Sequence, residues 1–158
     1  MPNLNELGLI LAPTFRSRAY VQYFVERGLV PGGALLLPGD ESTWAGPAQV
    51  DVELPRRETP FTFRTGEPAK ETAANAGWEL SDLPNDDINS SDCAAFLKNV
   101  PQGVLIYSGL PKALIKQGTL DTGKKFLHAP GGYLPHYRGS TGFYFSLLDQ
   151  GKIGTTVI

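Results

Sequence analysis

Three continuous apolar runs of strand length stand out along the chain, at Leu7–Leu11, Ala34–Leu37 and Gly103–Tyr107. Unbroken apolar runs are typical of strands whose two faces are both buried, as in a parallel sheet. Between the first two runs, Thr14 is placed to cap a helix that continues to Arg27, with a glycine directly after it. The order of strand, helix and strand predicts a right-handed βαβ unit.

The rest of the chain continues this alternation of strand and helix patterns. Two short alternating stretches within 49–54 and 60–65 indicate an edge hairpin or an irregular excursion. We expect further helices at 67–76, 90–99, 111–118 and 140–150, and further strands at 78–80, 124–128 and 153–158. The predicted fold is therefore α/β, a three-layer Rossmann-like domain over 1–158 with a mainly parallel sheet and helices on both faces.

Composition and charge narrow the class of protein. The 158 residues are 41% hydrophobic and 19% charged, with a formal net charge of -2, so neither nucleic acid nor an anionic membrane is an expected partner. Cys93 is the only cysteine, which excludes an internal disulfide and favours a reducing compartment. No apolar run reaches the roughly 20 residues of a membrane span, and no secretory signal begins the sequence. The expected location is cytoplasmic.

Several motifs argue against particular chemistries. The loop after the first strand has no Gly-x-Gly-x-x-Gly, which disfavours a dinucleotide site, although Arg16 and Arg18 remain available to an anion. Asp86 and Asp87 are adjacent carboxylates, but their position before a helix favours a solvated turn over a metal site. Cys93 falls within a helix and has no activating neighbour, so packing is the expected role and no metal is predicted.

The stretch from Lys124 to Thr141 carries the most chemistry. His128 ends the expected strand, and a glycine- and proline-rich loop leads from it to Ser140 and Thr141, which are placed to cap the next helix. Ligands of open α/β sheets bind beyond the carboxyl ends of the strands, where this loop lies. His128 can serve as a structural hydrogen-bonding group or as a catalyst. Arg138 can bind an anion or tie the loop together.

The second half of the chain resembles the catalytic domain of the formyltetrahydrofolate-dependent formyltransferases. That family includes the glycinamide ribonucleotide, methionyl-tRNA and sugar-nucleotide formyltransferases. The resemblance rests on Asn89-Ser90, the run GVLIYSG, Leu110-Pro111 and the segment from Leu134 to Gly139, followed by the closing IGTTVI. The most specific part is Leu-Pro-x-Tyr-Arg-Gly.

The resemblance implies a site and a donor. It implies 10-formyltetrahydrofolate as formyl donor and two sets of binding residues, and His128, two residues before the family's histidine position, would take the role of the catalytic group. The folate side would be formed by Tyr107, Ser108, Gly109, Leu110 and Pro111, and the acceptor side by Arg138, Gly139, Ser140 and Thr141. Tyr133 and Tyr137 would either flank a planar pteridine ring or pack within the loop.

The sequence also departs from the family pattern. Counting back from Leu134-Pro135, the family's catalytic histidine position falls on Pro130, and its asparagine position falls on His128. The catalytic aspartate of the family would follow Ile158. The implied function is transfer of a formyl group to an amine, or to water in a hydrolase variant. The alternative is a non-catalytic or truncated domain that binds a small molecule or a protein partner. As a strand lacking its next neighbour, 153–158 would also favour self-association through an unpaired edge.

Overall fold

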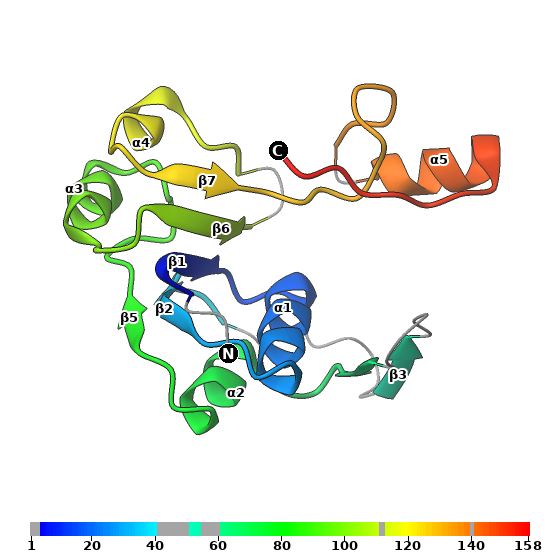
Figure 1. The fold of residues 1–158 in the computed structure, drawn as a ribbon. Helices are drawn as coiled ribbons and strands as arrows, with labels where there is room; N and C mark the ends of the chain where they lie inside the picture. Colours follow the sequence, from blue (N-terminus) through cyan, green and yellow to red (C-terminus); the bar gives the residue numbers. More distant parts are fainter. Residues whose placement is uncertain (1–3, 41–50, 55–60, 111–112, 140) are drawn as a thin grey trace.

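The protein is built on a five-stranded sheet in which every pair of neighbouring strands is parallel (Figure 1). The computed structural model describes residues 4–40, 51–54, 61–110, 113–139 and 141–158. The strand order is β5-β2-β1-β6-β7. The strands are β1 (Leu4–Leu11), β2 (Pro31–Leu36), β5 (Leu80–Asp82), β6 (Val104–Ser108) and β7 (Lys125–Leu127).

Helices cover both faces of this sheet, as the alternating pattern predicts. The helices are α1 (Phe15–Glu26), α2 (Ala69–Asn75), α3 (Ser91–Asn99), α4 (Gln117–Leu120) and α5 (Gly142–Gln150). One buried cluster joins the sheet to α1 and α2, and a second joins its other face to α3. The three-layer α/β architecture is therefore confirmed. Among the described residues, no helix has both the length and the apolar character that crossing a bilayer requires.

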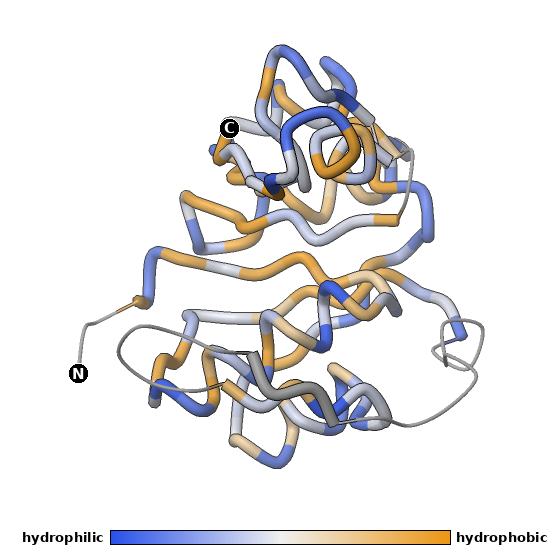
Figure 2. The backbone as a smooth tube through the Cα atoms, turned by 90° about the vertical axis from the view of Figure 1, so that its right-hand side faces the viewer, coloured by the Kyte–Doolittle hydropathy of each residue, from blue (hydrophilic) through white to orange (hydrophobic). Residues whose placement is uncertain are grey.

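The continuous apolar sequence of β1 is explained by the burial of both faces of this strand. Leu9 and Leu11 belong to the cluster under α1 and α2, whereas Ile10 and Ala12 belong to the cluster under α3. Successive side chains of a strand point to opposite faces, so a central strand of a covered sheet needs apolar residues at every position. Figure 2 shows these apolar stretches of backbone running through the middle of the molecule.

The predicted cap of α1 is confirmed, and α3 is capped in the same way. The Thr14 side chain accepts a hydrogen bond from the Ser17 backbone N–H, and the Ser90 side chain accepts one from the Cys93 N–H. Cys93 itself is fully buried, and its thiol donates to the Asn85 carbonyl, consistent with a packing role.

The two short alternating stretches form an antiparallel pair, β3 (Asp51–Leu54) with β4 (Phe61–Arg64). This pair is a separate two-stranded sheet and not an edge of the main one. The buried Gln22 side chain of α1 accepts a hydrogen bond from the Arg64 N–H and donates one to the Arg64 carbonyl, so it takes the place of a neighbouring strand.

The helix predicted at 111–118 is wrong over residues 113–116, because α4 begins only at Gln117. Asn89 explains the difference. Its side-chain oxygen accepts from the Lys116 N–H at 2.7 Å, and its amide donates to the Leu114 carbonyl at 3.0 Å. These bonds occupy backbone groups that a continuous helix would need.

The final strand predicted at 153–158 is also wrong, because this segment does not join the main sheet. It runs antiparallel to residues 128–132, with Gly131 bridged to Thr155 and His128 paired with Ile158. A parallel strand requires a crossover helix that packs on the sheet. Instead, α5 extends away from the sheet in Figure 1, and the chain returns beside its own loop.

We predict that Leu105→Ala destabilises the protein by about 2–5 kcal/mol, because Leu105 lies on the interior strand β6 and is fully buried in the cluster under α3. Leu114→Ala is the matched control, since Leu114 is 80% exposed and its loss changes stability by under about 0.5 kcal/mol. Urea denaturation followed by circular dichroism measures both. Equal effects of the two substitutions would contradict the assignment of the core.

Candidate functional site

The carboxyl ends of β1, β6 and β7 meet at one edge of the sheet. Leu11 of β1 pairs with Ser108 of β6, and Ile106 of β6 pairs with Leu127 of β7. His128 follows β7 directly and therefore lies beside Tyr107. The parallel register brings two predicted site segments, far apart in sequence, side by side at the edge where α/β folds bind ligands.

His128 is half-buried, and one of its ring nitrogens has a fixed partner. Its Nδ1 lies 2.9 Å from the backbone oxygen of Tyr107. A carbonyl oxygen only accepts hydrogen bonds, so Nδ1 must carry the proton and donate. In the neutral ring, Nε2 then carries a lone pair and acts as a base or hydrogen-bond acceptor.

Tyr107 forms a wall beside this histidine. Its ring centre lies 5.8 Å from that of His128, and its hydroxyl donates to the Ala113 carbonyl at 3.1 Å. A Cβ atom at Gly109 would lie 2.0 Å from the Tyr107 ring, so only glycine fits under it. Burial raises the pKa of the Tyr107 hydroxyl, an effect that the nearby Arg16 charge partly offsets.

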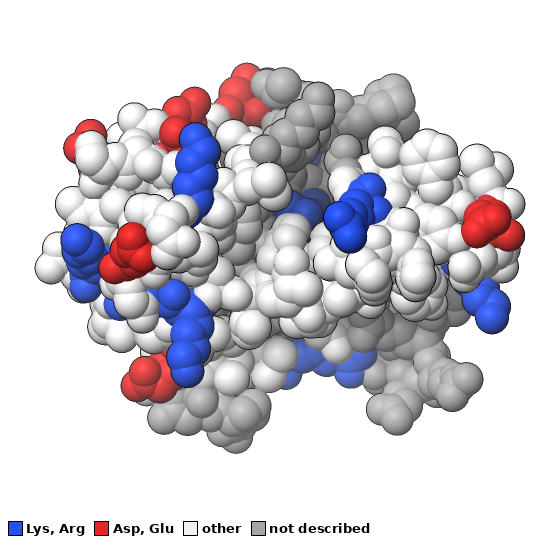
Figure 3. Space-filling model, turned by 90° about the horizontal axis from the view of Figure 1, so that it is seen from above, with Lys and Arg blue, Asp and Glu red and all other residues white. Residues whose placement is uncertain are grey.

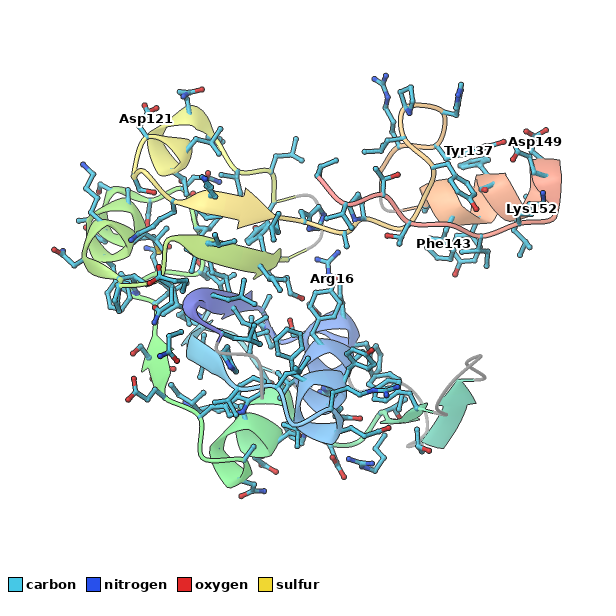
Figure 4. All side chains as sticks on the ribbon, in the orientation of Figure 1. Arg16, Asp121, Tyr137, Phe143, Asp149 and Lys152 are labelled. Carbon is cyan, nitrogen blue, oxygen red and sulfur yellow. The ribbon has the colours of Figure 1, made fainter. Side chains whose placement is uncertain are left out.

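Arg16 is a site residue that the sequence indicated only as one of two possible anion contacts. It extends from the first turn of α1 toward the ends of β6 and β7 (Figure 4). Its Nη2 donates to the Gly109 carbonyl at 2.8 Å and its Nε to the Ser108 hydroxyl at 3.3 Å. The guanidinium has five N–H donors, so it can hold this turn and still contact an anion. Arg18, in contrast, is 4% exposed and donates to the Thr65 carbonyl.

The buried Ser108 side chain connects the turn after β6 to α1. It is fully buried, and its hydroxyl lies 2.8 Å from that of the equally buried Ser17. Its side chain is thus part of the link between β6 and α1 and does not face solvent. Leu110 packs against the core under α3, and Pro111 lies outside the described residues.

The residues predicted for the acceptor side lie on a separate loop before α5. Arg138 is exposed and its Nε donates to the Pro135 carbonyl at 2.9 Å, which ties the loop together. Gly139 and Thr141 are exposed, Thr141 precedes α5 without a side-chain capping bond, and Ser140 lies outside the described residues. Among the described residues, no hydrogen bond or ion pair joins Arg138, Gly139 or Thr141 to His128.

The two loop tyrosines are engaged in packing. The Tyr133 ring lies against Gly154, where a Cβ would come within 2.2 Å, and the Tyr137 hydroxyl donates to the Asp149 carboxylate. The first contact holds the loop against the C-terminal segment, and the second holds it against α5, where Figure 4 shows Tyr137 beside Asp149.

A small hollow extends the same sheet edge past β1 toward β2 and β5. Its volume is about 230 Å³, and Pro13, Pro38 and Gly39 form part of its wall. Lys70 and Asp82, 3.4 Å apart, also line it. This volume is below the usual range for a whole ligand, so it suits one polar group of a larger molecule.

Comparison with solved structures identifies the class of fold. Phosphoribosylglycinamide formyltransferase from Streptococcus pneumoniae TIGR4 matches with a TM-score of 0.60 at 11% identity, over 96% of this chain and 71% of that one. Glycinamide ribonucleotide transformylase 1 from Symbiobacterium toebii matches with a TM-score of 0.59 at 15% identity, over 96% and 63%. Formyltetrahydrofolate deformylase from Burkholderia mallei ATCC 23344 matches with a TM-score of 0.50 at 12% identity, over 96% and 53%.

The chain therefore has the formyltransferase fold, as its sequence resemblance implies. It spans between 53% and 71% of the length of these three structures. No family model matches the sequence, and a comparison with curated proteins gives no match. At these identities the likeness establishes the fold alone.

We predict that Tyr107 makes the protein less stable at alkaline pH. Its pKa is raised above the ordinary value of 10.0 in the folded state, so its contribution to stability is present below about pH 10 and is lost as pH rises through the folded pKa. Urea midpoints measured at pH 8 and pH 11 should fall less for Tyr107→Phe than for the unsubstituted protein. Equal falls would show that Tyr107 does not contribute.

Proposed function

We propose that this protein transfers a formyl group from 10-formyltetrahydrofolate to an amine. The observation that carries the proposal is the His128 imidazole, which has Nδ1 bound to the Tyr107 carbonyl and Nε2 free to accept, at the carboxyl edge of a formyltransferase fold. The structural neighbours include a phosphoribosylglycinamide formyltransferase and a formyltetrahydrofolate deformylase, which supports the same donor chemistry.

The proposed reaction uses Nε2 of His128 as a general base. The acceptor nitrogen attacks the formyl carbon, the carbonyl π electrons move to oxygen, and Nε2 takes the proton that the attacking nitrogen loses. When the tetrahedral intermediate collapses, the C–O double bond re-forms and the bond to N10 of the folate breaks. The imidazolium then returns its proton to N10. The Tyr107 carbonyl stabilises the imidazolium through Nδ1–H between these steps.

The predicted binding residues are assigned to two sides of His128. The folate side is the turn made by Tyr107, Ser108, Gly109, Leu110 and Pro111, in which Ser108 acts by holding the backbone. The acceptor side is Arg138, Gly139, Ser140 and Thr141, to which we add Arg16 as a contact for an anionic group. We also propose a cytoplasmic location, a small-molecule substrate and a capacity for self-association.

A non-catalytic domain is the second candidate, and one observation favours it. Pro130 stands at the histidine position of the family pattern and has no side-chain donor for an oxyanion. Its carbonyl instead accepts from the Thr155 hydroxyl at 2.6 Å, so this position serves the packing of the C-terminal segment. Such a domain would keep a ligand site without the chemistry.

Calorimetric titration with a stable analogue of 10-formyltetrahydrofolate distinguishes the two candidates. Saturable binding near 1 μM, about -8 kcal/mol, is expected for a folate site. We predict that His128→Ala leaves this affinity within about threefold but lowers formyl transfer by about 10²–10⁴. His136→Ala is the matched control, because His136 is exposed on the neighbouring loop, and it should retain transfer.

Each other outcome has a definite meaning. Binding without transfer in the unsubstituted protein, across a panel of amines and water, would establish the non-catalytic candidate. No binding by a properly folded sample would overturn the folate site, and the formyltransferase fold would then reflect common architecture only.

A further inference from the structure

A larger cavity lies at the edge of the sheet opposite the candidate site. Its volume is about 300 Å³, at the lower limit of the usual range for small-molecule sites. Gly33 lines it near the start of β2, Glu79 precedes β5, and Gln102 precedes β6, so its wall comes from the amino ends of the strands. The last turn of α3 forms its other side, and Figure 1 shows this helix on the side of the molecule opposite α5. We call this the amino-edge cavity.

A glycine leaves this space open on the face of the sheet that α3 covers. Along β2, Leu35 and Leu37 place their side chains in the cluster under α3, and Gly33 lies on the same face, two positions before Leu35. Gly33 has no side chain to extend this row, so the cavity opens where a further side chain would lie. A Cβ atom at Gly33 would meet no atom closer than 3.5 Å, so no close contact requires glycine here.

The Gln102 side chain presents a buried hydrogen-bond acceptor to the cavity. Gln102 is 6% exposed, and its Nε2 donates to the Gly32 carbonyl at 2.7 Å. A carbonyl oxygen only accepts hydrogen bonds, so the amide nitrogen must face Gly32 and Oε1 must face away from it. Oε1 accepts no hydrogen bond from the described residues, although Gln102 is part of the cavity wall. Buried polar groups are normally paired, so this oxygen points to a donor on a ligand.

The other polar side chains of the wall can also accept hydrogen bonds. Glu79 and Ser81 alternate with Leu80, which packs toward α1 and α2, so both face the α3 side of the sheet. The Glu79 carboxylate has no ion pair or hydrogen bond among the described residues. The Asn99 amide donates to the Ala95 carbonyl at 3.0 Å, which leaves its oxygen to accept. Among the described residues of the wall, none is basic.

Apolar side chains complete the wall of the cavity. Leu35, Phe96 and Val100 line it, and all three belong to the cluster under α3 or pack against it. A ligand that fills this space therefore needs a small apolar body in addition to a hydrogen-bond donor.

Charge decides the polar group of the ligand. Glu79 and the Oε1 atom of Gln102 would repel an anion, whereas an ammonium group can donate to both. The cavity also lies at the carboxyl end of α3, where the helix dipole favours a cation and where Lys124 already donates to the Val100 carbonyl. Figure 3 shows acidic and basic side chains mixed over the part of the molecule that carries α3 and α4, so no field of one sign opposes this choice.

We propose that the amino-edge cavity binds a small molecule in which an ammonium group is joined to an apolar body. The ammonium group donates to Gln102 Oε1 and to the Glu79 carboxylate, and the apolar body lies against Leu35, Phe96 and Val100. None of these residues belongs to the proposed formyl-transfer site, so binding here is independent of formyl transfer.

Titration of the isotope-labelled full chain with benzylammonium, followed by amide NMR spectra, tests the proposal. We expect saturable shifts of the Gly33 backbone amide and the Gln102 side-chain amide. Benzoate carries the opposite charge on a similar ring and should produce none. Benzyl alcohol should bind about five- to tenfold more weakly, because its hydrogen bond to the cavity is no longer charge-assisted.

Three variants test the contacts. Gln102→Met should weaken benzylammonium binding by about 10–100-fold, because the buried acceptor is lost. Glu79→Gln should weaken it by about two- to fivefold, because Glu79 is exposed. Glu71→Gln is the matched control for Glu79→Gln: it removes the same charge from an exposed position of α2, which covers the other face of the sheet, and affinity should be unchanged.

Gln102→Met also removes the hydrogen bond to Gly32, so circular dichroism checks its folding. Gly33→Ala keeps that bond and places a methyl group on the cavity face, at ordinary contact distance from the Gln102 amide. It should weaken binding by at least about fivefold through overpacking, which tests the cavity even where Gln102→Met does not fold.

The position of the shifts separates this proposal from formyl transfer. Benzylammonium shifts confined to Tyr107 and His128 would overturn the amino-edge cavity and would instead support an amine acceptor at the carboxyl edge. The absence of saturable shifts, equal binding of benzoate, or equal effects of Glu79→Gln and Glu71→Gln would also overturn it. Saturable shifts at Gly33 in a chain without formyl transfer would support the cavity and count against the proposed reaction alone.

Discussion

The burial of β1 between β2 and β6, with both of its faces covered, is the constraint on which the rest of the structure depends. Leu9 and Ile10 are fully buried on opposite faces, so neither helix layer can shift without exposing one of them. The parallel pairing of β1 with β6 fixes where both strands end. After the pairing stops, Ala12 N–H still donates to the Ser108 carbonyl at 2.8 Å. The position of the candidate site follows from this register.

Polar side chains at the carboxyl edge of the sheet also connect β6 to α1. The hydroxyls of Ser17 and Ser108 are buried against each other, and Arg16 spans from α1 to the Gly109 carbonyl. A buried polar network is stabilising only when its members are satisfied, and here each serine has a partner on the other segment. The Arg16 guanidinium is thus held in place by the Gly109 carbonyl and the Ser108 hydroxyl, and both of these residues are buried.

The sequence predicts the sheet and its helices because those elements depend on local patterns. Apolar runs locate β1, β2 and β6, and the Thr14 cap locates the start of α1. The sequence places β5 about two residues early, at Trp78–Leu80, because Trp78 packs under α1 and α2 just before the strand begins.

The two larger errors have long-range causes. Asn89 reaches 25 residues along the chain to block the start of a helix, and no local pattern reveals this contact. Likewise, the direction of 153–158 depends on whether α5 packs on the sheet.

The misassigned C-terminal segment gives His128 a support that the sequence does not reveal. His128 follows β7, and its ring is fixed through Nδ1 to Tyr107. Its backbone N–H donates to the Ile158 carbonyl at 2.8 Å, and its carbonyl accepts from the Ile158 N–H at 2.9 Å. The histidine is therefore held from both sides, by the sheet and by the end of the chain. Pre-organisation of this kind fixes the tautomer before any ligand arrives, because the Tyr107 carbonyl can only accept. Nε2 has no hydrogen-bond partner among the described residues, so the contact of Nδ1 with the Tyr107 carbonyl leaves Nε2 as the accepting nitrogen of the neutral ring.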